Sequence, residues 1–186
     1  DVCSSDLLVF SALMGLFTFA FGPLTVEAAP IEKKSTAVRC TEAGADLVAS
    51  LTPELREKAL WEFDIEPRKL WSYMPWITGL SEREEGITID EMSIEQRKKV
   101  HVLFQCGFSS RGYQKLVSVM HLDDALKEER HLLPDLGLGD TPIGSSFFWF
   151  AIFGDPTNEN HWAWQLEGHH IALNFTIVGD EIAVTP

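Results

Sequence analysis

The chain has 186 residues, and its 28 acidic and 15 basic residues give a formal net charge of -13 at pH 7. Binding to nucleic acid needs a basic surface that neutralises phosphates, and binding to anionic lipid needs basic clusters, so this charge argues against both kinds of partner. The length suits a single domain with a hydrophobic core of its own.

An uncharged apolar run lies near the start of the chain, from residue 7 to residue 22. Val26 and Ala28 supply the small residues that signal peptidase requires before the bond it cleaves. The run is shorter than the about 20 apolar residues of a membrane-spanning helix, and no basic stop-transfer cluster follows it. We therefore predict a signal peptide over residues 1–28 and a secreted or periplasmic protein that leaves the membrane after cleavage. An uncleaved membrane anchor is the alternative. Because the chain begins with Asp1, without the Met and basic residues of a signal peptide, we expect its start to be truncated.

A polar segment over residues 29–41 follows, and we expect it to be a flexible leader to a single domain over residues 42–186. The predicted mature chain keeps two cysteines, Cys40 and Cys106. In an oxidising compartment such a pair often forms a disulfide. The alternative is that Cys106, which lies in an apolar helical stretch, is an ordinary buried thiol.

Helix signals fill the first half of the domain. Thr52 followed by Pro53 indicates a helix start, because Thr caps the free amides and Pro fits the first helical position. Ser93 and Gln96 have the spacing of a capping box, which opens another helix. The predicted helices cover residues 43–50, 53 to about 61 or 63, 94 to about 107, a stretch that contains residues 116–120, and 123 to about 131. An irregular or strand-like segment is expected over residues 67–76, and loops are expected over residues 79–86 and 134–144.

The periodicity changes in the second half from helical to alternating. Residues 146–153 are a continuous, largely aromatic run bounded by turn residues, which is typical of a strand buried on both faces. Residues 161–166 and 170–178 alternate, and Gly179-Asp180 is a two-residue hairpin signal. Strands that follow helices in this way predict an α+β fold, with a helical N-terminal half followed by an antiparallel meander.

Five short blocks of residues resemble one known family. They are residues 61–63 (WEF), 92–97 (MSIEQR), 108–113 (FSSRGY), 150–156 (FAIFGDP) and 162–170 (WAWQLEGHH). In this order they resemble the exported family catalogued as domain of unknown function 3500, and the last block is the most specific. Members of that family are longer, so the resemblance implies a chain truncated at its C-terminus. It implies no activity, because none is assigned to the family.

The block Glu167-Gly168-His169-His170 is where we expect chemistry. The tryptophans before this block have even residue numbers, and the apolar residues after it have odd ones. Because side chains alternate between the two faces of a regular strand, an unbroken strand would place these two sets on opposite faces. A bulge at Gly168-His169 reconciles the two patterns, since a bulge adds one residue to a strand and glycine is its usual site. Such a bulge places Glu167 and His170 on one face and re-aims His169.

A glutamate and two histidines brought together in this way have two chemical uses. Glu167, His169 and His170 are predicted metal ligands, which offer two nitrogens and a carboxylate to a divalent transition metal. They are equally an acid/base group, in which the carboxylate fixes the imidazole tautomer. The alternative is structural: the three side chains satisfy one another's hydrogen bonds beside the tryptophans.

Arg111 is a further candidate for the site, because an arginine near a helix start can hold the anionic group of a small-molecule ligand. Its alternative role is to pair with one of the many carboxylates of this chain. Two hypotheses about function follow. The first is an exported enzyme, hydrolytic or metal-assisted, that uses Glu167, His169 and His170 together with Arg111. The second is a non-catalytic exported binding or scaffold domain.

The last predicted strand, over residues 181–185, is followed at once by the end of the sequence. A strand ribbon gains little stability without a third strand or a covering layer, and this chain is rich in aromatic residues, with 12 Phe and 6 Trp. We therefore expect the truncation to leave an apolar patch on one side of the sheet, larger than the few hundred Å² usual for a monomer.

Overall fold

The computed structural model describes residues 34–64, 66–69, 86–129, 143–158 and 160–185, which all belong to one compact unit, Lys33–Pro186. The predicted signal peptide lies outside these residues, as does most of each segment that we expected to be irregular. Within the described ranges, no helix is long and apolar enough to cross a membrane.

Helices make up the first part of this unit, as predicted. They are α1 (Thr36–Ser50), α2 (Pro53–Ala59), α3 (Ile94–Gly107) and α4 (Ser110–Glu129), with short 3-10 turns at Glu66–Lys69 (η1) and Ile89–Glu91 (η2). The hydroxyls of Ser35, Thr52 and Ser93 accept backbone N–H bonds at the starts of α1, α2 and α3. The side chain of Gln96 in turn accepts from the amide of Ser93 at 2.8 Å, which confirms the predicted capping box.

Three helix boundaries differ from the prediction. α1 begins at Thr36, inside the segment expected to be a flexible leader, because Ser35 caps it there. α2 ends at Ala59, since Leu60 and Trp61 pair with a strand instead. α4 is a single helix where two were predicted, and it runs without a break past residue 123.

The strands form one sheet, in the order β1-β3-β4-β5-β6 with β2 also paired to β3. They are β1 (Leu60–Trp61), β2 (Ile87–Thr88), β3 (Trp149–Phe153), β4 (His161–Gly168), β5 (Ile171–Val178) and β6 (Glu181–Thr185). Strands β3 to β6 are an antiparallel meander, which confirms the α+β fold, and Gly179-Asp180 is the predicted two-residue turn. The short β1 adds a parallel pairing to β3 that was not predicted.

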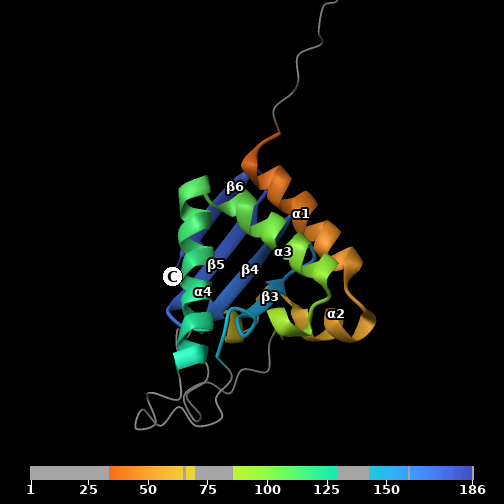
Figure 1. Ribbon diagram of the computed structural model, residues 1–186. Coiled ribbons are helices and arrows are strands. Elements are labelled where there is room, and N and C mark those ends of the chain that lie inside the picture. Colours follow the sequence, from red (N-terminus) through yellow and green to blue (C-terminus); the bar gives the residue numbers. More distant parts are fainter. Residues whose placement is uncertain (1–33, 65, 70–85, 130–142, 159, 186) are drawn as a thin grey trace, which may run out of the picture. The chain divides into compact units, whose positions relative to one another are not determined.

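Helices α1, α3 and α4 lie on one face of this sheet (Figure 1). The core between the layers is aromatic: Trp164 of β4 stacks on its cross-strand partner Phe175 with ring centroids 4.1 Å apart, and Phe104 of α3 packs on Trp164. Each of these side chains is almost fully buried. Burying an apolar side chain of this size stabilises a fold by about 1.5–3 kcal/mol, so these contacts fix how the helices sit on the sheet.

A disulfide joins two of the covering helices. Cys40 of α1 and Cys106 of α3 are bonded, with their Cα atoms 5.3 Å apart. Of the two roles open to these cysteines, the structure therefore shows the disulfide. It closes a segment of 66 residues and links α1 to α3 over the sheet.

Candidate functional site

The two adjacent histidines occupy the tight turn between β4 and β5. Gly168 ends β4 and pairs directly with Ile171, the first residue of β5. His169 and His170 are therefore the two turn residues, and they lie at the end of the longest strand pair of the meander.

The predicted bulge at Gly168-His169 is wrong. In a hairpin with a two-residue turn, one residue of each facing pair has an even number and the other has an odd number. Trp164 and Phe175 are such a pair, and their side chains lie on the same face. Gly168 has a packing role instead. A Cβ at this position would lie 2.2 Å from a ring carbon of Phe148, whose side chain is fully buried.

Helix α4 supplies a partner for the first histidine. The Nδ1 of His169 and the Oδ1 of Asp123 are 2.5 Å apart, although 46 residues separate them in the sequence. Asp123 is 6% exposed, and the side chain of His169 is 18% exposed. Burial raises the pKa of the Asp123 carboxyl, while the hydrogen bond and the charge of His169 oppose this rise. When Nδ1–H donates to the carboxylate, the neutral imidazole carries its lone pair on Nε2.

The second histidine is exposed and lies against the first. The rings of His169 and His170 stack with their centroids 4.0 Å apart. His170 has a φ of 59°, and among the described residues it is the only one other than glycine with a positive φ. This left-handed conformation is uncommon for a residue with a side chain, and such strain is concentrated at functional sites.

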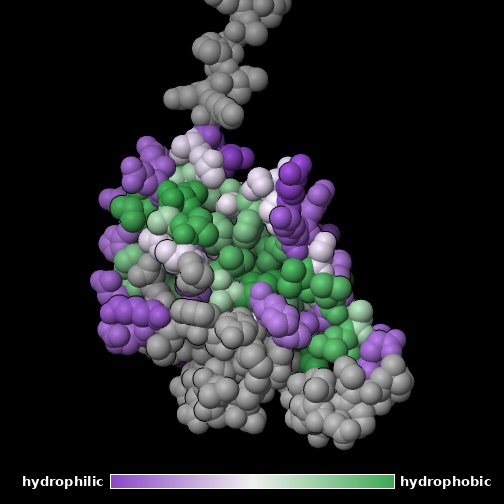
Figure 2. Space-filling view, turned by 90° about the vertical axis from the view of Figure 1, so that its left-hand side faces the viewer, coloured by the Kyte–Doolittle hydropathy of each residue, from purple (hydrophilic) through white to green (hydrophobic). Residues whose placement is uncertain are grey.

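A groove of about 340 Å³ borders this turn, between α4 and β5. Its apolar lining comes from Leu116 and Val119 of α4, from Ile171 and Leu173 of β5, and from Phe108 just after α3. His170 at the turn and Lys115 of α4 also line it. Figure 2 views the molecule from the side of α4 and shows apolar side chains gathered on this side. In the described part of the chain, β6 pairs with β5 only from Asn174 onward, so residues 171–173 are left without a strand on that side. An apolar area on one side of the sheet is thus present, whereas its predicted size and its predicted cause stay predictions.

Glu167 is not grouped with the histidines. Trp164 and Leu166 of the same strand pack into the core under the helices, so Gln165 and Glu167 point to the opposite face of the sheet. Glu167 is 0% exposed there. His169 reaches α4 on the helical side, and the two side chains therefore point to opposite faces.

Arg111 is also remote from the turn. It is exposed in the first turn of α4, and Asp123 is twelve residues further along, about 18 Å at the rise of an α-helix. The hydroxyl of Ser109 accepts from the amide of Gly112, so it already occupies one of the amides that could have held an anion beside Arg111.

No group of three or more His, Cys, Asp or Glu side chains that could hold a metal ion comes together among the described residues. The predicted set of Glu167, His169 and His170 therefore has no support from the described geometry. What the structure does bring together is Asp123, His169 and His170.

Asp123 was not among the residues predicted for the site, although the sequence contains a signal for it. Leu116, Met120 and Asp123 are spaced i, i+4 and i+7, so they form one stripe of α4, and all three are buried. An acidic residue in an otherwise apolar stripe needs a polar partner, and the partner proves to be the histidine turn.

No curated protein and no solved structure matches this chain. The family described as a protein of unknown function (DUF3500) matches residues 33–186. That range covers the four helices, the six strands, the histidine turn and the groove. The resemblance noted on the short sequence blocks is thus confirmed over all of the described residues, and the protein belongs to the DUF3500 family.

Proposed function

We propose that this protein is an exported hydrolase in which the His169-His170 turn supplies a general acid/base beside an apolar binding groove. The observation that carries the proposal is the place of His170, whose side chain lines the groove and stacks on His169, which Asp123 holds. Histidine is the side chain most often used for proton transfer near neutral pH, and its orientation is commonly set by a hydrogen-bonded partner.

In this reaction His170 takes a proton from the attacking water and returns it to the leaving group. Asp123 and His169 are positioning residues, because they fix the turn without lining the groove. The backbone of His170 supports the same role. A turn position with positive φ, where glycine or asparagine costs less, carries a histidine instead.

The groove indicates the class of substrate. Its volume of about 340 Å³ lies within the range of small-molecule sites, about 300–1,000 Å³. Its walls are mostly apolar side chains of α4 and β5, and the polar residues among the described ones that line it are His170 at the turn and Lys115 of α4. We infer a small ester or amide whose apolar part lies along the groove and whose carbonyl lies at the His170 end.

Export is the second part of the proposal. The disulfide between Cys40 and Cys106 supports it, because disulfides persist mainly in oxidising compartments such as the periplasm and the extracellular space. The apolar run over residues 7–22, with small residues at Val26 and Ala28, supports the same route.

Hydrolysis of p-nitrophenyl esters with acyl chains of increasing length tests the enzymatic part. We expect turnover that favours chains long enough to fill the groove, and we expect His170→Gln to lower kcat by about 100-fold or more. His161→Gln is the matched control, because His161 is an exposed histidine at the opposite end of β4, and its rate should equal that of the wild type. Equal rates for His170→Gln and the wild type would overturn the proposal.

The alternative is a non-catalytic binding or scaffold domain, and one contact favours it. The Asp123–His169 hydrogen bond ties α4 to the sheet, which is a sufficient structural reason for the pair. His169→Gln distinguishes a structural role of this pair from a positioning role. If the pair is purely structural, the substitution should lower only the melting temperature. If His169 positions His170, the substitution should also change kcat and its pH profile. Metal analysis completes the test: a stoichiometric transition metal that His170→Ala loses would support a metal-assisted hydrolysis instead.

A further inference from the structure

A second cleft, of about 190 Å³, lies where α3 and α4 meet the loop before β3. Among the described residues, its polar lining consists of Arg97 and His101 from α3, His121 from α4, and Ser145 and Ser146 from the loop. None of these residues lines the groove beside the histidine turn, so the two sites can be tested separately.

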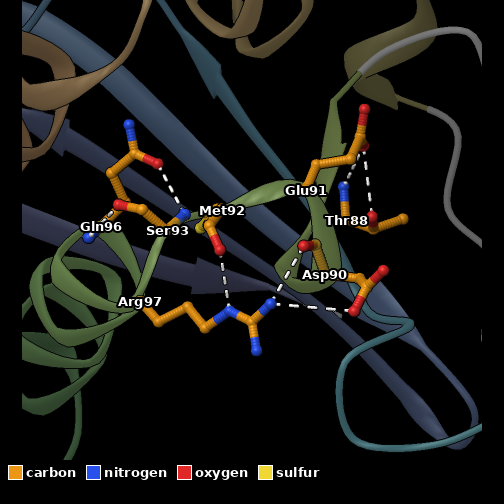
Figure 3. A network of polar contacts seen from close by, with 7 residues as sticks. All are labelled: Thr88, Asp90, Glu91, Met92, Ser93, Gln96 and Arg97. Carbon is orange, nitrogen blue, oxygen red and sulfur yellow. Dashed lines mark hydrogen bonds and ion pairs between the residues drawn. The ribbon is translucent and has the colours of Figure 1, made fainter.

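The guanidinium of Arg97 is held in place by the loop that precedes α3 (Figure 3). Its Nε donates to the carbonyl of Met92 and its Nη2 to the carbonyl of Asp90, each at 2.9 Å, and the Asp90 carboxylate lies 3.7 Å from Nη2. Two capping boxes fix the same loop. Within the part of the chain that the structure describes, Nη1 makes no hydrogen bond, so Arg97 is fixed with donor capacity to spare.

Ser145 and Ser146 are fixed through their backbones. The amide of Ser145 donates to Oδ1 of Asp124 at 2.8 Å, and the carbonyl of Ser146 accepts from the amide of Asp90 at 2.9 Å. Neither serine hydroxyl bonds to another described residue. Both hydroxyls are therefore available as donors on a wall that the backbone holds in place.

The two histidines line the cleft from neighbouring helices. His101 is partly buried, with Nδ1 3.0 Å from the hydroxyl of Tyr113, and His121 is exposed. Burial and, after it, the charge of His121 lower the pKa of His101. The imidazoles thus lie close enough for their positive charges to repel.

We propose that this cleft binds a small oxyanion, such as phosphate or a carboxylate. An arginine, two histidines and two serines line it, and charged donors of this kind are how proteins recognise such groups. An anion between the histidines also relieves the repulsion of their charges. The net charge of the chain is -13, so its overall field repels anions and the affinity has to come from these local donors.

Binding should strengthen as the pH falls, because a protonated imidazole donates from both nitrogens and carries a positive charge. In the described part of the chain, the other titratable or charged groups around the two histidines are Arg97, Asp90, Tyr113, Asp124 and Lys127. Both carboxylates are already engaged, Asp90 by Arg97 and Asp124 by the amide of Ser145. They therefore weaken the site less than free carboxylates would.

NMR titration of the histidine side chains with inorganic phosphate, and separately with acetate, tests this proposal. We expect saturable shifts of the His101 and His121 imidazole signals, with tighter binding at about pH 5.5 than at about pH 8. The acetate arm tells whether the site takes a carboxylate as well as a tetrahedral oxyanion. Absence of shifts with both anions at both pH values would overturn the proposal.

Two variants locate the binding. His121→Gln should keep the fold, since His121 is exposed, and should weaken phosphate binding about tenfold, the loss expected for one charged hydrogen bond. Arg97→Lys keeps the charge but loses the planar fork, and should weaken binding at every pH. His161→Gln should bind as the wild type does. The same affinity in all three variants would show that the anion binds elsewhere, and the proposal would be wrong.

Discussion

The helices that cover the sheet are attached to it in two different ways. α1 and α3 are joined by the Cys40–Cys106 disulfide, and each of them meets the sheet closely enough to require a glycine. A Cβ on Gly44 of α1 or on Gly107 of α3 would lie 2.7 Å from the ring of a buried aromatic residue. These two helices are therefore held by a covalent bond and by direct contact with the aromatic core.

α4 has no disulfide and no glycine that approaches a ring of the sheet so closely, although its Leu116 and Met120 belong to the hydrophobic core. Its buried side chains are Leu116, Met120 and Asp123, and polar contacts link it to the sheet and to the loop before β3, from Asp123 to His169 and from Asp124 to the amide of Ser145. Both the groove and the oxyanion cleft border α4. α1 and α3 are thus the more firmly held part of the helical layer, and both candidate sites lie along α4, whose polar contacts to the sheet and the loop are made by titratable groups.

Removal of the disulfide should give the largest effect. In Cys40→Ala/Cys106→Ala, the loss of a cross-link that spans 66 residues should cost about 4 kcal/mol of unfolding free energy. Urea unfolding of the purified protein measures it. A variant as stable as the wild type would mean that packing alone holds α1 and α3. The disulfide would then not distinguish these helices from α4 in stability.

Gly107→Ala tests the close approach of α3. The added methyl group would meet the ring of Phe175, which is 1% exposed, so we expect a loss of about 2–3 kcal/mol. Gly112→Ala in α4 is the matched control, because its Cβ would come no closer than 3.2 Å, to a ring carbon of Phe108. That variant should stay within about 1 kcal/mol of the wild type. Equal losses in the two variants would contradict the comparison.

Asp123→Ala should destabilise the packing of α4 on the sheet, while α1 and α3 should stay in place. The loss of the contact to His169 should cost about 2 kcal/mol, since hydrogen bonds to charged groups contribute about 1.5–3 kcal/mol. Amide hydrogen exchange should become faster in α4 and remain slow in α1 and α3. Uniformly faster exchange would show that α4 unfolds together with the other helices.

His170→Gly separates function from stability at the turn. Glycine removes the cost of the left-handed conformation but also the ring stack on His169, so the unfolding free energy should change by less than about 1 kcal/mol. Ester hydrolysis should nevertheless be lost. Gly179→Ala, at a positive φ in the next turn of the meander, should instead cost about 1 kcal/mol. A His170→Gly variant that remains active would remove the turn from the proposed mechanism.

The smallest effect concerns pH. The pKa of His101 is lowered in the folded protein by burial and by the charge of His121, whereas the unfolded chain keeps the ordinary value of about 6.5. Between these two pKa values the unfolded state binds more protons, so the wild type should lose stability as the pH falls below about 6.5. His101→Gln should flatten this part of the curve in urea unfolding at a series of pH values. An unchanged slope would show that His101 does not contribute.

Signals between near neighbours predicted much of this fold correctly. The caps at Thr52 and Ser93, the switch from helical to alternating periodicity, and the turn at Gly179 all depend on residues within a few positions of one another. The change from even to odd apolar positions around Gly168 is also present in the structure. A bulge and a two-residue turn produce the same change, so the pattern could not distinguish them.

The sequence by itself therefore determined the class of the fold, the starts of α2 and α3, the run of strands β3 to β6 and the presence of two histidines at a special backbone position. Only the tertiary structure decided which groups meet: Asp123 with His169 across 46 residues, and Arg97, His101 and His121 around one cleft. It also separated Glu167 and Arg111 from the histidines with which they had been grouped. The physical reason is range. Capping and periodicity act between residues within a turn or two, whereas a site is assembled by the register of strands and the docking of helices on a shared core.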